Sequence, residues 1–191
     1  MLFDASESSV EENARQCREV VEEALKYGAH VEGEIAAFRR TEEVAGDQAD
    51  REYCLETVVE FVKATGVDVF APAIGNAHGV YQGTPKLDCD RVSGIAEQAH
   101  LPIALHGGTG MTPGQFVELI RGSRAKVNTS TALKSALKIS HLKSGFDDMS
   151  PHPGKYDPVA VMEVEASAVS EMAKERMRLF GSVGRSCMSR R

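Results

Sequence analysis

The chain has 191 residues, of which 42% are hydrophobic and 26% charged, with 17 glycines and 7 prolines. This composition is ordinary for a soluble globular protein, and it excludes a disordered or collagen-like chain. The apolar runs are too short to cross a bilayer and are interrupted by charge, so neither a transmembrane helix nor a membrane partner is expected. The acidic segment Met1–Val10 lacks the features of a secretory signal, and a cytoplasmic location is the simplest expectation.

The charge and the cysteines of the chain limit the partners and the disulfides that can be expected. The 22 Lys and Arg residues against 28 Asp and Glu give a net charge of -6. A negative field repels phosphate backbones, so nucleic acid is not an expected partner. The cysteines are scattered without a CxxC pair and are expected to be reduced, with Cys17 and Cys54 as small buried side chains in helical patterns.

Helical and strand patterns alternate along the chain. Ser9–Glu12 fits a capping box, and Gly28 and Gly66 follow two helical patterns as stop signals. The expected helices and strands, in chain order, are a strand at Met1–Asp4, a helix from Ser9 to Tyr27, a strand at His30–Phe38, a helix at Arg51–Thr65, a strand at Val67–Ile74, a helix at Arg91–His100, a strand at Pro102–Leu105, a helix at Pro113–Arg121, a strand at Ala125–Asn128, a helix at Thr131–Leu142, a loop at Ser144–Asp157 and a helix from Pro158 to Phe180.

Strict alternation of strands and helices predicts an α/β fold, with right-handed βαβ units around a parallel sheet. Five strands are expected, within a single domain that spans residues 1–191. In such folds ligands bind at the carboxyl ends of the strands. Four polar or glycine-rich clusters follow apolar strands here, and we expect them to form one rim: Asp4–Ser6, Gly75–Gly79, His106–Gly110 and Asn128–Thr131.

Two histidines in this rim are candidate zinc ligands. His78 and His106 each follow an apolar strand and have a glycine neighbour, which lets the backbone approach a bound group. The alternative is a pair of hydrogen-bonded loop histidines, because a catalytic zinc takes three protein ligands. Glu32 and Glu34 alternate along one strand and could orient a metal ligand or act as acid and base. A solvent-facing strand edge is the alternative for these carboxylates.

The loops also offer an anion site. Gly107–Gly110 and Asn128–Thr131 supply clustered backbone N–H groups and hydroxyls, the second run just before a helix. Such groups suit a phosphate. The alternative for Ser130 or Thr131 is an ordinary helix N-cap.

Several of these segments, in this order and at this spacing, resemble the class II, zinc-dependent ketose-bisphosphate aldolases. The resemblance covers nearly the whole chain. The segments that carry it are Asp4–Ser6 with Glu11–Asn13, Val31–Glu34, Gly66–Ala71, Ile74–Tyr81, Pro85–Asp88, Leu105–Gly110, Lys126–Thr131 and Leu179–Gly184.

The resemblance implies a TIM (β/α)8 barrel that cleaves fructose or tagatose 1,6-bisphosphate reversibly to dihydroxyacetone phosphate and glyceraldehyde 3-phosphate. It also implies Zn2+, a monovalent cation (Na+ or K+), a phosphorylated sugar substrate and a homo-oligomer. Carried over residue by residue, it makes His78, His106 and Glu34 the metal residues, Glu42 and Asn128 the catalytic residues, and Gly79, Gly107, Gly108, Thr109, Asn128, Thr129, Ser130 and Thr131 the substrate-binding residues.

The chain also departs from the family pattern. The family's catalytic aspartate and first zinc histidine precede the segment that Met1–Ser6 resembles, so the expected strands are strands four to eight of a barrel whose N-terminal strands are missing. Little or no activity is therefore expected from this chain alone. Smaller departures are Ala36, Arg39 and Arg40 near the loop acid Glu42, and Ala132, where the family has an acidic residue.

Two other functions fit the same residues. One is a non-catalytic aldolase-like subunit or phosphosugar-binding scaffold. The other is a phosphosugar isomerase or epimerase, since two histidines and a phosphate site also suit proton transfer. The sequence does not distinguish fructose from tagatose bisphosphate.

Overall fold

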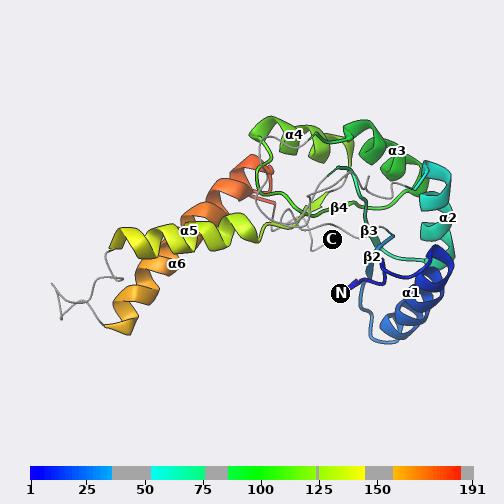
Figure 1. Cartoon of the computed structure of the whole chain (residues 1–191), viewed down its shortest axis with the longest axis horizontal. Coiled ribbons are helices and arrows are strands. Elements are labelled where there is room, and N and C mark those ends of the chain that lie inside the picture. The colour runs from blue at the N-terminus through cyan, green and yellow to red at the C-terminus, as the bar shows by residue number, and fades with distance from the viewer. Residues whose placement is uncertain (36–52, 76–85, 124, 145–156, 186–191) are drawn as a thin grey trace. The chain divides into compact units, whose positions relative to one another are not determined.

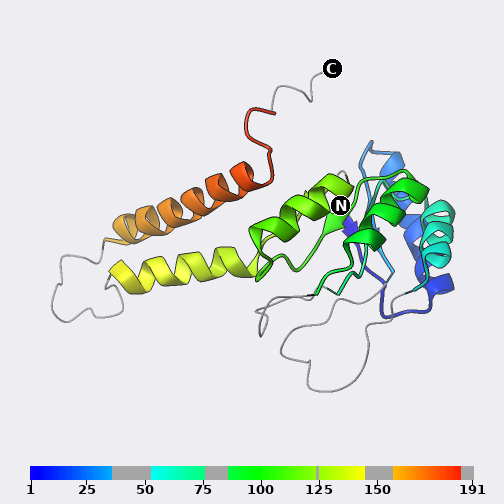
Figure 2. The same cartoon turned by 90° about the horizontal axis from the view of Figure 1, so that it is seen from above.

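The computed structural model describes residues 1–35, 53–75, 86–123, 125–144 and 157–185. Contacts divide the chain into two compact units, Met1–Asn128 and Thr129–Arg191, and each is described by itself. The expected single domain stays a prediction. Figures 1 and 2 show the elements, which are β1 (Leu2–Phe3), α1 (Val10–Leu25), β2 (Glu32–Glu34), α2 (Leu55–Thr65), β3 (Val69–Ala71), α3 (Cys89–Ala99), β4 (Ala104–Leu105), α4 (Pro113–Gly122), β5 (Lys126–Val127), α5 (Thr131–Ser144) and α6 (Pro158–Leu179).

The first unit is built from βα repeats, as the sequence predicts. Strands β1, β2 and β3 form one parallel sheet in that order, and β4 pairs with β5 in parallel. A parallel bridge between Phe70 and Ile103 connects the two sheets. Helices α1 to α4 pack in chain order, each against the next, on the outer side of the strands (Figure 1). The α/β class is confirmed, whereas the described strands do not close a barrel, so the barrel stays a prediction.

The strands are shorter than their apolar patterns predict. The expected strand Val67–Ile74, for example, is paired only over Val69–Ala71. Pro72 follows directly and has no N–H to donate to a neighbouring strand, which ends the pairing. Residues 36–38 of the expected strand His30–Phe38 lie outside the described residues.

Several helix ends agree with their sequence signals, although α2 begins at Leu55 rather than at the expected Arg51 and α1 ends at Leu25 rather than Tyr27. Ser9 caps α1 by accepting a hydrogen bond from the Glu12 amide at 3.3 Å. Gly66 ends α2 in the left-handed conformation with φ of 72°. Thr112 and Gln115 form a complete capping box at the start of α4. No helix among the described residues is long and apolar enough to span a membrane.

The core of the first unit lies between the strands and the inner faces of α1 to α4. Cys17 is fully buried there, and burial raises the pKa of its thiol to about 11. The same expectation for Cys54 is wrong, because Cys54 is the exposed N-cap residue of α2. The fully buried side chains of the core include Val31, Val58, Phe70, Ile74, Val92, Ile95, Ile103, Leu105, Phe116 and Leu119.

The second unit contains the pair of helices α5 and α6, which pack against each other. His141 Nδ1 of α5 lies 3.0 Å from Glu165 Oε1 of α6. Asp157 caps α6 by accepting from the Val159 amide, and Pro158 occupies the first turn, where it has no helical hydrogen bond to lose.

Gly33 sets how closely β2 approaches the helix layer. A methyl group on Gly33 would lie 2.9 Å from Val67 Cγ1 and 3.4 Å from Cys17 Sγ, and both neighbours are buried. Contacts between such atoms are ordinarily about 3.5–4.0 Å. Because Gly33 stands between Glu32 and Glu34, it also fixes the position of both carboxylates.

We therefore expect Gly33→Ala to lower the free energy of unfolding by about 1–3 kcal/mol, through overpacking. Gly94→Ala is the matched control, since a methyl group there lies 3.4 Å from Leu55 Cδ2 and the residue is inside α3. The control should be neutral or stabilising by up to about 1 kcal/mol. Urea denaturation measures both, and equal midpoints for the two variants would contradict the packing argument.

Candidate functional site

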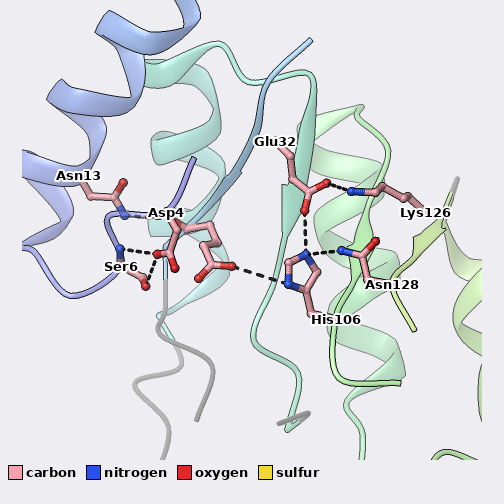
Figure 3. Close-up of polar contacts among 8 residues, drawn as sticks. Asp4, Ser6, Asn13, Glu32, His106, Lys126 and Asn128 are labelled. Atoms are coloured by element: carbon pink, nitrogen blue, oxygen red, sulfur yellow. Dashed lines mark hydrogen bonds and ion pairs between the residues drawn. The ribbon is translucent and has the colours of Figure 1, made fainter. Parts of the chain in front are cut away.

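The candidate site lies at the carboxyl ends of the strands in the first unit. Asp4 and Ser6 follow β1, Glu32 and Glu34 belong to β2, His106 follows β4, and Lys126 and Asn128 lie in and after β5. Figure 3 shows the side chains that it labels converging from separate segments of the chain: Asp4, Ser6, Glu32, His106, Lys126 and Asn128. Parallel strands place their carboxyl ends on one edge, which brings together residues up to 124 positions apart in the sequence.

His106 is at the centre of this cluster and is only 4% exposed. Its Nε2 lies 2.7 Å from Glu32 Oε1, and its Nδ1 lies 4.0 Å from Glu34 Oε2. The second oxygen of Glu32 accepts a hydrogen bond from Lys126 Nζ at 2.6 Å. Asn128 Nδ2 lies 3.1 Å from His106 Nε2. The imidazole is therefore contacted on both nitrogens by residues of β2.

Glu32 and Glu34 are 5% and 4% exposed, so the alternative of a solvent-facing strand edge is wrong. Burial alone would raise the pKa of Glu32, but hydrogen bonds from His106 and Lys126 outweigh it and lower that pKa below its ordinary value. Glu32 is therefore a carboxylate at neutral pH.

Glu34 behaves in the opposite way. Burial, and then the charge of Asp4, raise the pKa of Glu34 to about 8. Burial also raises the pKa of Asp4, but hydrogen bonds from the Ser6 hydroxyl and amide, at 2.6 Å and 3.0 Å, outweigh it and leave the net shift downward. At neutral pH the pair therefore keeps its negative charge on Asp4 and a proton on Glu34.

Asn13 of α1 fixes the end of β2. Its side chain is 1% exposed, and its Nδ2 donates to the backbone oxygen of Glu34 at 2.9 Å. This contact ties the helix to the strand residue whose carboxyl faces His106.

The glycine-rich loop after β4 packs closely against its surroundings. Gly107 adopts φ of 64°, a conformation that favours glycine. A methyl group on Gly108 would lie 3.1 Å from the Phe116 ring and 3.6 Å from the Asn128 carbonyl oxygen. Gly108 is buried and Thr109 is partly exposed. The predicted substrate contacts of Gly107, Gly108 and Thr109 stay predictions.

Other predicted site residues are not brought to this cluster by the described structure. His78, Gly79 and Glu42 lie outside the described residues. Thr129, Ser130 and Thr131 belong to the second unit, where Thr131 begins α5. The Thr129 hydroxyl is buried without a hydrogen-bond partner among the described residues. The predicted roles of these six residues stay predictions.

Two side chains of the cluster fit a metal ion chemically. An imidazole nitrogen and a carboxylate oxygen are both zinc ligands, and two ligands of a tetrahedral zinc lie about 3.4 Å apart. His106 Nδ1 and Glu34 Oε2 are 4.0 Å apart, so a small side-chain rotation would let one ion reach both. Within the described part of the chain, no group of three His, Cys, Asp or Glu side chains could hold a metal. The described residues therefore fit two positions of a metal site.

Sequence analysis missed two residues of the cluster, Asn13 and Lys126. In the sequence Asn13 is an ordinary position inside a helix. Only its burial against β2 in the structure shows that it contributes to the cluster. The sequence contains a weak signal for Lys126, because a lysine is unusual in a short apolar strand. Two glutamates expected at the same edge of the sheet could have been taken as its partners. Its side chain is 53% exposed while its ammonium group reaches the buried Glu32.

Comparison with known proteins gives a consistent result. The profile of the family described as "Fructose-bisphosphate aldolase class-II" matches residues 1–185. The chain is 35% identical over 188 residues to a 6-phospho-5-dehydro-2-deoxy-D-gluconate aldolase of Bacillus licheniformis, covering 97% of this chain and 62% of that protein. It is 34% identical over 189 residues to a fructose-bisphosphate aldolase of Geobacillus stearothermophilus, covering 97% of this chain and 63% of that protein.

Solved structures show the same fold. The YdjI aldolase from Escherichia coli K12 superposes with a TM-score of 0.78 at 29% identity, over 97% of this chain and 62% of that one. A putative fructose-1,6-biphosphate aldolase from Coccidioides immitis gives a TM-score of 0.78 at 28% identity, over 96% and 63%. The chain thus spans less than two thirds of the length of these relatives.

The contact made by Asn13 can be tested with an isosteric change. Asn13→Asp puts a carboxyl group against the backbone oxygen of Glu34. That backbone oxygen can only accept a hydrogen bond, so an ionised carboxylate cannot replace the amide donor. We expect a loss of about 2–4 kcal/mol in the free energy of unfolding at pH 7, because burial raises the folded-state pKa of the introduced carboxyl by about 2–3 units. The loss should shrink as the pH falls toward about 4, where the unfolded state is also protonated.

Gln16→Glu, an equivalent amide-to-acid change on the same helix, is the control. Gln16 donates to Glu12 near the surface, so its replacement should cost about 0.5 kcal/mol or less. Denaturation at pH 7 and pH 4 measures both variants. A pH-independent loss in Asn13→Asp would contradict the burial of this contact.

Proposed function

Because the chain belongs to the class II fructose-bisphosphate aldolase family, we propose that it carries part of the active site for reversible, zinc-dependent aldol cleavage of a ketose 1,6-bisphosphate. The substrate would be fructose or tagatose 1,6-bisphosphate, and the products dihydroxyacetone phosphate and glyceraldehyde 3-phosphate. One observation carries the proposal: His106 and Glu34 face each other, both buried, at the carboxyl edge of the parallel strands.

The donor set gives His106 and Glu34 the role of holding zinc, with His78 as a further ligand by resemblance to the family. A bound zinc ion supplies Lewis acidity toward the ketose carbonyl and hydroxyl oxygens. The protein groups around it exclude water, because His106, Glu32 and Glu34 are each at most 5% exposed. Asn128 lies against His106, with its Nδ2 at 3.1 Å from Nε2, and by resemblance to the family it would contact the reacting part of the sugar.

The charge distribution indicates how the phosphates would be bound. The ammonium group of Lys126, the cation of the described cluster, is already paired with Glu32. Phosphate binding would therefore depend on backbone N–H groups and hydroxyls, which Gly107–Thr109 supply in the first unit. A monovalent cation near this loop would help to offset the charge.

The names of the relatives support a phosphorylated substrate without fixing its sugar. One relative is named for fructose bisphosphate and another for 6-phospho-5-dehydro-2-deoxy-D-gluconate. Both names specify an aldolase and a phosphorylated carbon chain. A homo-oligomer in the cytoplasm remains part of the proposal.

A second candidate function is a non-catalytic, phosphosugar-binding aldolase-like subunit. Such a subunit would bind the substrate without releasing triose phosphate. The two candidates therefore differ in a direct assay.

The assay couples triose phosphate release from fructose and tagatose 1,6-bisphosphate to a dehydrogenase, with added zinc and then with EDTA. The chain alone should release little or no triose phosphate. Joining the preceding barrel segment of the Geobacillus stearothermophilus relative ahead of Met1 should produce release that EDTA abolishes. His106→Ala should reduce that release by more than about 100-fold, because it removes a ligand rather than an outer partner of one.

His30→Ala is the control, since the His30 side chain is 82% exposed. It should leave release unchanged. Release that resists both EDTA and His106→Ala would contradict zinc dependence. Absence of release from a folded joined protein that still binds the bisphosphate would favour the non-catalytic subunit.

A further inference from the structure

Glu32 makes two contacts that no proposed catalytic role requires. One carboxylate oxygen lies 2.7 Å from His106 Nε2, and the other accepts from Lys126 Nζ at 2.6 Å. The three residues come from β2, from the loop after β4 and from β5 (Figure 3). The bridge thus connects the two parallel sheets at the site.

The contact with Glu32 determines which nitrogen of His106 carries the proton. A carboxylate can only accept a hydrogen bond, so an approach of 2.7 Å requires a proton on Nε2. In the neutral ring the lone pair is then on Nδ1, the nitrogen that faces Glu34 Oε2. In the structure Asn128 Nδ2 faces His106 Nε2 at 3.1 Å, so a proton on Nε2 requires the Asn128 amide to be turned, which brings its oxygen to this side. Glu32 and that oxygen then share the single Nε2 proton, with Glu32 at 2.7 Å as its main acceptor.

Lys126 keeps Glu32 in this arrangement. An ammonium group has three donors and no acceptor, so it holds the second oxygen of Glu32 and leaves the first for His106. Glu32 is 5% exposed, and a buried carboxylate is costly without such partners. The long aliphatic stem of Lys126 lies at the surface while its charge reaches inward.

We propose that Glu32 and Lys126 are positioning residues that fix the tautomer of His106, with Nε2 protonated and the Nδ1 lone pair directed to the side of Glu34. In a metal site this arrangement presents Nδ1 as the ligand, and outer carboxylates of this kind orient metal-binding histidines generally. The metal part rests on the proposed function, whereas the tautomer is a property of the chain without metal.

The bridge gives this proposal an unusual test. In Glu32→Gln the Lys126 ammonium group still requires an acceptor, so the amide oxygen should face Lys126. The amide NH2 group would then face Nε2, which must accept instead of donate. The tautomer of His106 should therefore invert and place the proton on Nδ1.

Removing the ammonium group should release this constraint. In the double variant Glu32→Gln with Lys126→Met, the amide can turn its oxygen toward His106, and the Nε2-protonated form should return. Lys126→Met alone leaves a carboxylate that can only accept, so its tautomer should stay as in the parent chain. The double variant should thus resemble the parent more than the single Glu32→Gln variant does.

Two-bond 1H–15N NMR spectra of the full chain, labelled in its histidines, distinguish protonated from unprotonated ring nitrogens. The spectra are recorded without metal over a series of pH values, and the tautomer is assigned from spectra in which the His106 ring carries a single proton. The signal absent from His106→Gln identifies His106. Asp68→Asn is the matched control, because Asp68 Oδ1 lies 3.0 Å from His30 Nδ1 and this change should alter His30 and leave His106 unchanged.

Inversion in Glu32→Gln with recovery in the double variant supports the proposal. An unchanged Nε2-protonated form in folded Glu32→Gln, or inversion without recovery, would overturn it. If Glu32→Gln does not fold, the parent chain and Lys126→Met still decide. A proton on His106 Nδ1 in the parent chain would overturn the proposal. A proton on Nε2 in both the parent chain and Lys126→Met would support it.

Calorimetric titration with Zn2+ alone separates this proposal from the proposed function. Glu32→Gln should weaken zinc binding by about 10–100-fold, the usual effect of losing such a partner, and the double variant should recover part of it. The NMR spectra could show the expected tautomers while the chain binds no zinc. That result would count against zinc dependence and still support the positioning roles of Glu32 and Lys126. Equal zinc affinity in the parent and Glu32→Gln would overturn the link from tautomer to metal.

Discussion

The candidate site depends on how one buried carboxylate, that of Glu32, is satisfied. At 5% exposure it needs hydrogen-bond donors from the protein, and it finds them in His106 and Lys126. These donors lower its pKa, so it stays charged where a solitary buried glutamate would be protonated. The charge in turn sets the proton position on His106, which sets the nitrogen that faces Glu34. Each step follows from the preceding one by elementary hydrogen-bond chemistry.

Two glutamates separated by one residue thus have opposite electrostatic states. Glu32 has two donors and ionises readily, while Glu34 has Asp4 beside it and keeps a proton, with its pKa raised to about 8. Gly33 between them lets β2 pack closely against Val67, because a methyl group on Gly33 would lie only 2.9 Å from Val67 Cγ1. The three residues Glu32–Glu34 therefore determine both how closely β2 packs and which charges the site carries.

Much of this architecture could be predicted from sequence. The order of strands and helices follows from apolar periodicity, and Ser9 and Gly66 mark helix ends as expected. The length of β3 was overestimated, because the expected strand Val67–Ile74 followed the apolar pattern and ignored Pro72, which has no N–H to donate to a neighbouring strand. Family resemblance pointed to His106 and Glu34. Lys126 and Asn13 were missed because their importance comes from contacts 94 and 21 positions away, which no local pattern encodes.

The most direct test is a crystal structure of the chain soaked with zinc, with anomalous scattering used to locate the ion. The account predicts a zinc peak within about 2.0–2.2 Å of both His106 Nδ1 and a Glu34 oxygen. His106 Nε2 should stay hydrogen-bonded to Glu32, and Lys126 should remain on the far oxygen of that carboxylate. Zinc bound to Nε2 with Glu32 displaced, or zinc bound away from His106, would contradict the account.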